Sequence, residues 1–252
     1  MWNDFQTDTL GGMIAENILM EGHDGKQIHA YYSRPTVEGN YPGIVLIPHM
    51  PGWDEWCRET ARRFTEHGYE VVCPNIYEDF GHGTPAEISG KAREAGGVHD
   101  DSVMGDVKNA LGFLRSQPNT NGKVGVIGMC SGGRHAFLAA CQMDFDACAD
   151  CWGGGVIQEE TSEARPVSPI EYVENLNCPI IGIFGKEDRN PDTAQVDATE
   201  AALIKYKKEF EFSRYYGAGH GIWYYHTPMY RQAQAMDSFE KVMTFFEEKL
   251  KS

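Results

Sequence analysis

Basic residues are scarce in this chain of 252 residues, which carries 22 Lys and Arg against 37 Asp and Glu. The formal net charge is −15 with histidine neutral. Proteins that bind nucleic acid neutralise phosphates with clustered Lys and Arg, so this balance excludes a chain-wide nucleic-acid surface. It leaves open a local basic pocket, and we expect no nucleic-acid partner.

Long apolar runs are also absent. No stretch approaches the roughly 18 apolar residues that a membrane-spanning helix needs, so we expect no membrane partner. The first residues, Met1 to Gln6, lack the positive region and apolar stretch of a secretion signal, which predicts a cytoplasmic protein. Hydrophobic residues make up 41% and charged residues 23%, and this ordinary composition excludes a mainly disordered chain.

A disulfide framework is missing as well. The seven cysteines are odd in number and the chain is large, which predicts reduced thiols. The single C-x-x-C, at Cys148 and Cys151, has no second pair to complete a zinc site. It falls in a stretch typical of a strand, where residues three apart face opposite sides. Buried packing is therefore favoured over zinc or redox use, and we expect no metal site.

Short apolar runs alternate with segments of helical periodicity. This order is typical of an α/β fold with a mostly parallel central sheet and helices on both faces. The sequence shows neither an internal repeat nor a linker, so we expect one domain over 1–252. Strands are predicted over 13–20, 26–34, 43–47, 69–73, 123–127, 145–152, 178–184 and 210–215, and helices over 56–67, 101–117, 133–142, 193–208 and 229–250.

Two polar stretches interrupt this order. Residues 78–100 are rich in glycine and are the least regular part of the chain, so we expect a lid or cap there. Residues 158–169 are short and contain proline, which favours a loop beside the functional site over a domain boundary.

An apolar strand runs directly into Gly128-Met129-Cys130-Ser131-Gly132, and a predicted helix follows. Gly-x-nucleophile-x-Gly at a strand-to-helix turn is the nucleophile elbow, here with cysteine in the place of serine. Side chains two residues before and after the nucleophile would crowd this strained turn, so Gly128 and Gly132 fit there. With Ser131 as nucleophile, Met129 would take one of the crowded positions, which favours Cys130.

A catalytic thiol needs a base and a group that orients the base. Behind a nucleophile elbow these follow in the order acid, then histidine. Asp188 comes just after a predicted strand, and His220 lies between glycines in a later loop, so both are predicted as the partners of Cys130. Glu187 and Asp192 are neighbouring alternatives for the acid.

Two backbone N–H groups are expected to form an oxyanion hole. One belongs to Ser131, directly after the nucleophile. The other comes from the loop after the strand at 43–47, where Pro51 has no N–H to donate and Met50 is the better candidate.

Taken together, these segments resemble the dienelactone hydrolase family, also called carboxymethylenebutenolidases, of the α/β-hydrolase superfamily. The resemblance implies a triad of Cys130, Asp188 and His220 that hydrolyses esters or lactones without a cofactor. The matching segments are Arg58-Glu59-Thr60, His67-Gly68-Tyr69, Cys73-Pro74-Asn75-Ile76-Tyr77, Asn121-Gly122-Lys123-Val124-Gly125, Gly128-Met129-Cys130-Ser131-Gly132-Gly133, Gly185-Lys186-Glu187-Asp188 and Gly217-Ala218-Gly219-His220.

The best-known members of that family differ from this chain at two positions. They carry a glutamate that holds the resting thiol, where this chain has His49. They also carry an arginine that binds the substrate carboxylate, where this chain has Tyr224. His49 is left with three roles, which are to interact with Cys130, to touch the substrate or to hold its loop.

The pocket is therefore predicted to be more aromatic and more neutral than in those members. Arg93, in the stretch expected to be a lid, either pairs with an anionic substrate or is a solvated charge on a helix. The residues predicted to bind substrate are His49, Trp53, Arg93, Trp152, Trp223 and Tyr224.

These features predict a cysteine hydrolase of small carboxylic esters or lactones that works through a thioester acyl-enzyme, as a monomer or homodimer. Two alternatives stay open. The same pocket could hydrolyse other electrophiles, such as phosphotriesters or thioesters, or the chain could bind a small ligand without turnover.

Overall fold

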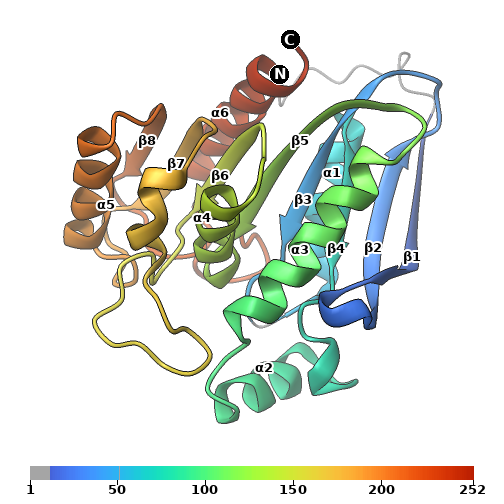
Figure 1. Cartoon of the computed structure of the whole chain (residues 1–252). Helices are drawn as coiled ribbons and strands as arrows, with labels where there is room; N and C mark the ends of the chain where they lie inside the picture. Colours follow the sequence, from blue (N-terminus) through green and yellow to red (C-terminus); the bar gives the residue numbers. More distant parts are fainter. Residues whose placement is uncertain (1–11, 51) are drawn as a thin grey trace.

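The computed structural model describes residues 12–50 and 52–252, so Met1 to Gln6 and Pro51 lie outside the described residues. An eight-stranded sheet in the order β1-β2-β4-β3-β5-β6-β7-β8 runs through the centre of the described chain (Figure 1). Its strands are β1 (Met13–Glu21), β2 (Gln27–Pro35), β3 (Tyr41–Ile47), β4 (Glu70–Pro74), β5 (Thr120–Met129), β6 (Ala147–Cys151), β7 (Ile180–Gly185) and β8 (Phe210–Tyr215).

Antiparallel pairing is confined to one edge of the sheet. β1 pairs with β2 and β2 with β4 in antiparallel fashion, whereas every pair from β4 through β3 to β8 is parallel. Asp24 and Gly25 turn the chain between β1 and β2 with positive φ angles of 52° and 76°. The prediction of a mostly parallel sheet is confirmed.

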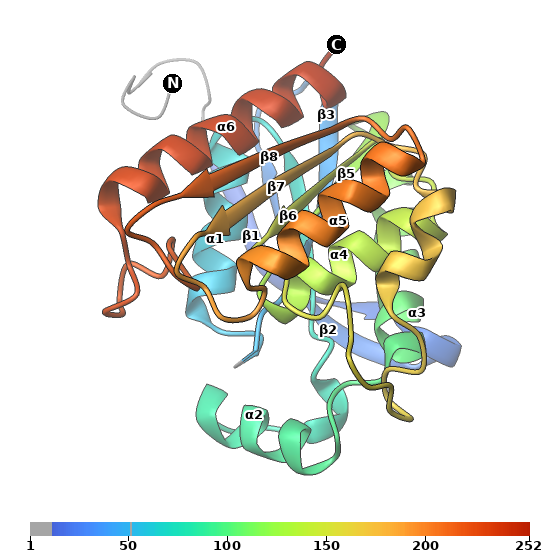
Figure 2. The same ribbon diagram turned by 90° about the vertical axis from the view of Figure 1, so that its left-hand side faces the viewer.

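Helices cover both faces of the sheet, as predicted (Figure 2). One face carries α1 (Glu55–Glu66) and α6 (Gln232–Leu250), and the other carries α3 (Asp100–Arg115), α4 (Ser131–Gln142) and α5 (Thr193–Lys205). Each face has its own apolar core, which is what a parallel sheet with crossover helices requires. No helix of the described chain has both the length and the apolar character to cross a bilayer.

The parallel strands bring their carboxyl ends to one edge of the sheet. β3 ends at Ile47, β5 at Met129, β7 at Gly185 and β8 at Tyr215. Segments that are far apart in sequence therefore emerge side by side, and this edge is where open α/β sheets place their sites.

The expected lid stretch is more regular than its composition predicted. It contains η2 (Glu78–Phe80) and α2 (Pro85–Glu94), and α2 lies apart from the helices that cover the sheet (Figures 1 and 2). A capping box starts α2, since Thr84 accepts from the Glu87 N–H while the Glu87 carboxylate accepts from the Thr84 N–H. This local signal compensates for the weak apolar periodicity of the segment.

A buried ion pair joins the end of this stretch to α4. Arg134 is fully buried, and its guanidinium donates to both carboxylate oxygens of Asp100 at 2.6 and 2.8 Å. It also donates to the Gly155 carbonyl at 3.1 Å and to Gln158 Oε1 at 3.2 Å. Burial would raise the pKa of Asp100, but His135, whose Nε2 lies 3.3 Å from Oδ1, and Arg134 lower it to about 2.

We expect Asp100→Ala to lower the free energy of unfolding by about 3–5 kcal/mol, because it leaves the Arg134 charge buried without its partner. The lowered pKa means that the carboxylate stabilises the fold above its ordinary value of 3.8 and loses this contribution as the pH falls toward 2. Denaturant titrations at neutral and acidic pH measure both effects. Asp101→Ala, at the exposed neighbouring position, is the control. Equal effects of the two variants would contradict the assignment.

Candidate active site

Cys130 occupies a strained turn between β5 and α4. Its φ and ψ angles of 57° and −123° lie in a region that L-residues rarely adopt. A Cβ on Gly128 would lie 1.9 Å from the Gly132 carbonyl oxygen, and a Cβ on Gly132 would lie 2.4 Å from the Ile47 carbonyl oxygen. Both contacts are backbone contacts that cannot yield, which explains the glycines on either side of the cysteine.

Cys130 is also the accessible thiol of the chain. It is half-buried, whereas the other six cysteines are buried. Burial raises the pKa of most of these six, namely Cys57, Cys141, Cys148, Cys151 and Cys178, and keeps them as unreactive thiols. A reagent or substrate from solvent therefore meets Cys130 first.

His220 and Asp188 form a hydrogen-bonded pair beside this thiol. His220 Nδ1 lies 2.8 Å from Asp188 Oδ2, and Asp188 Oδ1 accepts from the Asn190 N–H at 2.9 Å. Burial would lower the pKa of His220, but Asp188 and the Cys130 side chain raise it to about 10. With Nδ1 directed at Asp188, Nε2 is the ring atom left for Cys130.

The two alternative acids are engaged elsewhere. Asp192 Oδ1 accepts from the Gln195 N–H at 2.8 Å and begins α5 in a capping box. Glu187 contributes its backbone N–H to the Ala218 carbonyl, and its side chain is exposed, whereas the hydrogen bond of His220 goes to Asp188. The geometry thus pairs Asp188, rather than either neighbour, with the histidine.

The two N–H groups predicted for an oxyanion hole are both unengaged. Ser131 is the first residue of α4, where an N–H has no partner inside its helix. Met50 lies in the turn after β3. Within the described residues neither N–H donates a hydrogen bond, so both are available to an oxyanion.

The family is shown by a match that covers most of the chain. The model of the dienelactone hydrolase family matches residues 28–250. The chain belongs to this family. Dienelactone hydrolases and their relatives hydrolyse lactones and esters, and this chain is an enzyme of that class.

Individual relatives agree with this assignment. A "Putative carboxymethylenebutenolidase" of Synechocystis sp. is 29% identical over 231 residues, which is 89% of this chain and 93% of the relative. The crystal structure of a "Putative Dienelactone Hydrolase" from Klebsiella pneumoniae has a TM-score of 0.85 at 24% identity and covers 94% of this chain and 99% of its own. The dienelactone hydrolase-like promiscuous phosphotriesterase P91, from metagenomic libraries, has a TM-score of 0.77 at 19% identity, with 95% of this chain and 100% of its own covered.

The His49 side chain is held by two hydrogen bonds. Its ring is hydrogen-bonded to the Tyr224 hydroxyl through Nδ1 at 2.7 Å and to Asp54 Oδ2 through Nε2 at 3.0 Å. Burial would lower the pKa of His49, but Cys57 and Asp54 raise it. His49, Asp54 and Cys57 have ligand atoms within 4.8 Å of one another, but each already has a hydrogen-bond partner without a metal ion.

Two of the residues predicted to bind substrate are buried in the apolar core. Trp152 is fully buried and meets Trp223 edge-on at 5.4 Å. Trp223 is 6% exposed and donates its indole N–H to Ser238 on α6. Trp53 is partly buried and donates to the Cys73 carbonyl at 2.9 Å.

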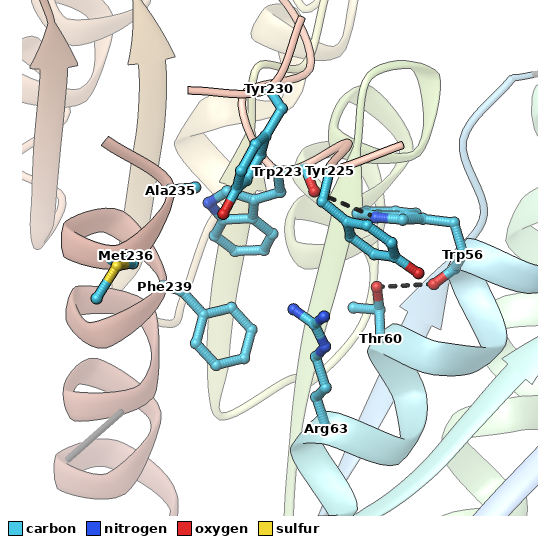
Figure 3. A pocket seen from close by; sticks show the side chains of 9 residues that line it. All are labelled: Trp56, Thr60, Arg63, Trp223, Tyr225, Tyr230, Ala235, Met236 and Phe239. Carbon is cyan, nitrogen blue, oxygen red and sulfur yellow. Dashed lines mark hydrogen bonds between the residues drawn. The ribbon is translucent and has the colours of Figure 1, made fainter. Parts of the chain in front are cut away.

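Trp223 borders a separate cavity of about 80 Å³ between α1 and α6 (Figure 3). Trp56 and Arg63 face it from α1, and Phe239 faces it from α6. Neither Cys130 nor His220 lines this cavity. It is distinct from the surroundings of the thiol.

Arg165 is the charged residue near the thiol that the sequence did not single out. Its side chain interacts electrostatically with Arg134 and Asp100 and, more weakly, with Tyr77 and Cys130, and a Cβ on Gly97 would lie 3.6 Å from its Nη2. Its Nε is buried without a hydrogen bond to any described residue. Arg93, the predicted arginine, is exposed on α2. Only the position of Arg165 in the stretch 158–169, expected beside the site, could have indicated it.

The raised pKa of His220 gives a pH-dependent contribution to stability. The folded protein holds this proton more tightly than the unfolded chain, so the contribution is complete below about pH 6.5 and is lost as the pH rises through about 10. The difference in Tm between wild type and His220→Ala should therefore shrink across this range in calorimetry. His226→Ala, at an exposed histidine outside the pair, is the control. A difference that grew with pH would contradict the pairing.

Proposed function

We propose that this enzyme hydrolyses small carboxylic esters or lactones with Cys130 as nucleophile, His220 as general base and acid, and Asp188 as the group that orients His220. The observation that carries the proposal is the Asp188–His220 pair, hydrogen-bonded at 2.8 Å, beside the one half-buried thiol of the chain. A nucleophile, a base and an orienting acid are the parts that acyl transfer needs.

The first half of the reaction forms a thioester. His220 takes the proton of the Cys130 thiol, either during the attack or beforehand in an ion pair, which the raised pKa of His220 favours. The sulfur then attacks the carbonyl carbon of the substrate. The N–H groups of Met50 and Ser131 stabilise the negative oxygen of the tetrahedral intermediate. The bond between the acyl carbon and the leaving oxygen then breaks, and the leaving oxygen takes the proton from His220. In a lactone this oxygen remains tethered to the acyl group.

The second half releases the acid. His220 takes a proton from water, and the resulting hydroxide attacks the thioester carbonyl. The carbon–sulfur bond breaks, and Cys130 recovers its proton from His220. An ester gives an acid and an alcohol, and a lactone gives a hydroxy acid.

The test is hydrolysis of a short-chain aryl ester by wild type, Cys130→Ser and His220→Ala. Both variants should lose at least about 10³-fold in kcat, since each removes a member of the catalytic unit. His226→Ala should retain activity. Iodoacetamide should label Cys130, identified by mass spectrometry, before the six buried thiols. Activity retained in both variants, or a label confined to other cysteines, would overturn the assignment of Cys130 as nucleophile, and absence of hydrolysis by wild type would favour a ligand-binding protein.

Arg165 supports a substrate that carries an anionic group close to the scissile bond. Its positive charge lies near Cys130, and its Nε has no hydrogen-bond partner among the described residues. A carboxylate on the substrate would supply that partner with a charge-assisted hydrogen bond.

We expect Arg165→Gln to raise KM for an anionic ester by about 10-fold or more and to leave a neutral ester of the same shape within about twofold. Paired Michaelis curves for the two esters measure this. Arg115→Gln, on the surface end of α3, is the matched control. If Arg93→Gln, and not Arg165→Gln, raised KM for the anionic ester alone, Arg93 of α2 would be the residue that binds the anionic group.

A further inference from the structure

The peptide that joins His49 to Met50 is held through its carbonyl oxygen. The Tyr77 hydroxyl donates to the His49 carbonyl at 3.1 Å, and Tyr77 is only 2% exposed. The carbonyl of His49 and the N–H of Met50 belong to the same planar trans peptide, in which they point in opposite directions. The hydrogen bond from Tyr77 therefore also sets the direction of the Met50 N–H.

The same residue is held a second time through its ring. Asp54 Oδ2 lies 3.0 Å from His49 Nε2, while Asp54 Oδ1 accepts from the Cys57 N–H at 3.0 Å and caps α1. On the other side of the ring, Nδ1 lies 2.7 Å from the hydroxyl of Tyr224, in the loop of His220. The His49 side chain thus bridges the start of α1 and the loop that carries the proposed base.

Tyr77 is itself held by hydrogen bonds of its backbone. It follows β4, its N–H donates to Asn75 Oδ1 at 3.2 Å, and its carbonyl accepts from the Phe80 N–H at 3.0 Å. Its hydroxyl also lies near the side chains of Ser131 and Cys130, although the buried Ser131 hydroxyl makes no hydrogen bond within the described residues. One buried hydroxyl therefore contacts the loop of Met50 and lies beside the first residue of α4.

We propose that Tyr77 is a positioning residue for the oxyanion hole. Its hydrogen bond to the His49 carbonyl orients the Met50 N–H, and the hydrogen bonds of the His49 ring with Asp54 and Tyr224 restrain the same peptide. This inference rests on the proposed ester or lactone hydrolysis at Cys130. An oxyanion donor acts where negative charge develops, so its misalignment slows turnover and leaves ground-state binding almost unchanged.

The test is Tyr77→Phe, which removes the hydroxyl and keeps the ring. We expect kcat for a short-chain aryl ester to fall by about 10-fold or more, short of the about 10²–10³ that follows loss of a donor, with KM within about twofold. The matched control is Tyr32→Phe, which also removes a buried tyrosine hydroxyl, here donated to Glu70 at 2.9 Å away from the thiol. Tyr32→Phe should keep kcat. Equal kcat in wild type and Tyr77→Phe would overturn the proposal.

Alkylation by iodoacetamide separates this role from a general effect on the thiol. That reaction displaces iodide at a tetrahedral carbon and develops no oxyanion, so Tyr77→Phe should alkylate Cys130 within about twofold of the wild-type rate. A parallel loss of alkylation and hydrolysis would mean that the Tyr77 hydroxyl acts on the reactivity of the Cys130 thiol, and it would overturn the proposal. Retained alkylation also reports a folded site in the variant.

Asp54→Asn provides a second variant should Tyr77→Phe fail to fold. Asparagine caps a helix about as well as aspartate, so α1 is preserved while the charged hold on His49 is lost. We expect a smaller fall in kcat than in Tyr77→Phe, again without a change in alkylation, and an unchanged kcat would count against the second restraint. Failure of the proposed function itself has a different signature, which is hydrolysis that survives Cys130→Ser.

Discussion

The tight contact between the turn at Cys130 and the end of β3 determines the layout of the site. Gly132 lies so close to the Ile47 carbonyl that no side chain fits between them. This contact brings the start of α4 against the loop that carries His49 and Met50. The positive φ of Cys130 then turns its side chain out of the helix that follows it. The proposed nucleophile and the proposed oxyanion donors therefore share one backbone scaffold.

Much of this scaffold could be predicted from local sequence. The order of strands and helices follows from apolar periodicity, and the strands at 43–47 and 210–215 agree with β3 and β8 to within two residues. The elbow was predictable because crowding at a tight turn leaves glycine as the residue that fits. Asp188 and His220 were predictable as a pair because each follows a parallel strand, and parallel strands share an edge.

Other features depend on contacts between distant segments, and local patterns do not encode them. The sequence predicts Trp152 and Trp223 as pocket walls, yet in the fold the two rings pack against each other and Trp223 also contacts Ser238 and Phe239 of α6. Arg165 is one polar residue in a polar loop, and only the fold shows that its charge lies near the thiol. Helix α2 forms because of a capping box rather than an apolar stripe, so periodicity underestimated its order.

The contacts of Arg134 have a consequence for how the site can open. This one side chain holds Asp100, at the end of the stretch that contains α2, and also holds Gly155 and Gln158, at the start of the loop that carries Arg165. The stretch that contains α2 and the loop that carries Arg165 are thus both attached to α4, the helix that follows Cys130. A movement that admits a substrate must therefore take place in the parts of the two segments that lie beyond the residues held by Arg134. Those parts can change in sequence while the held residues stay fixed. Relatives with different substrates can therefore differ in these two segments without disturbing the catalytic edge of the sheet.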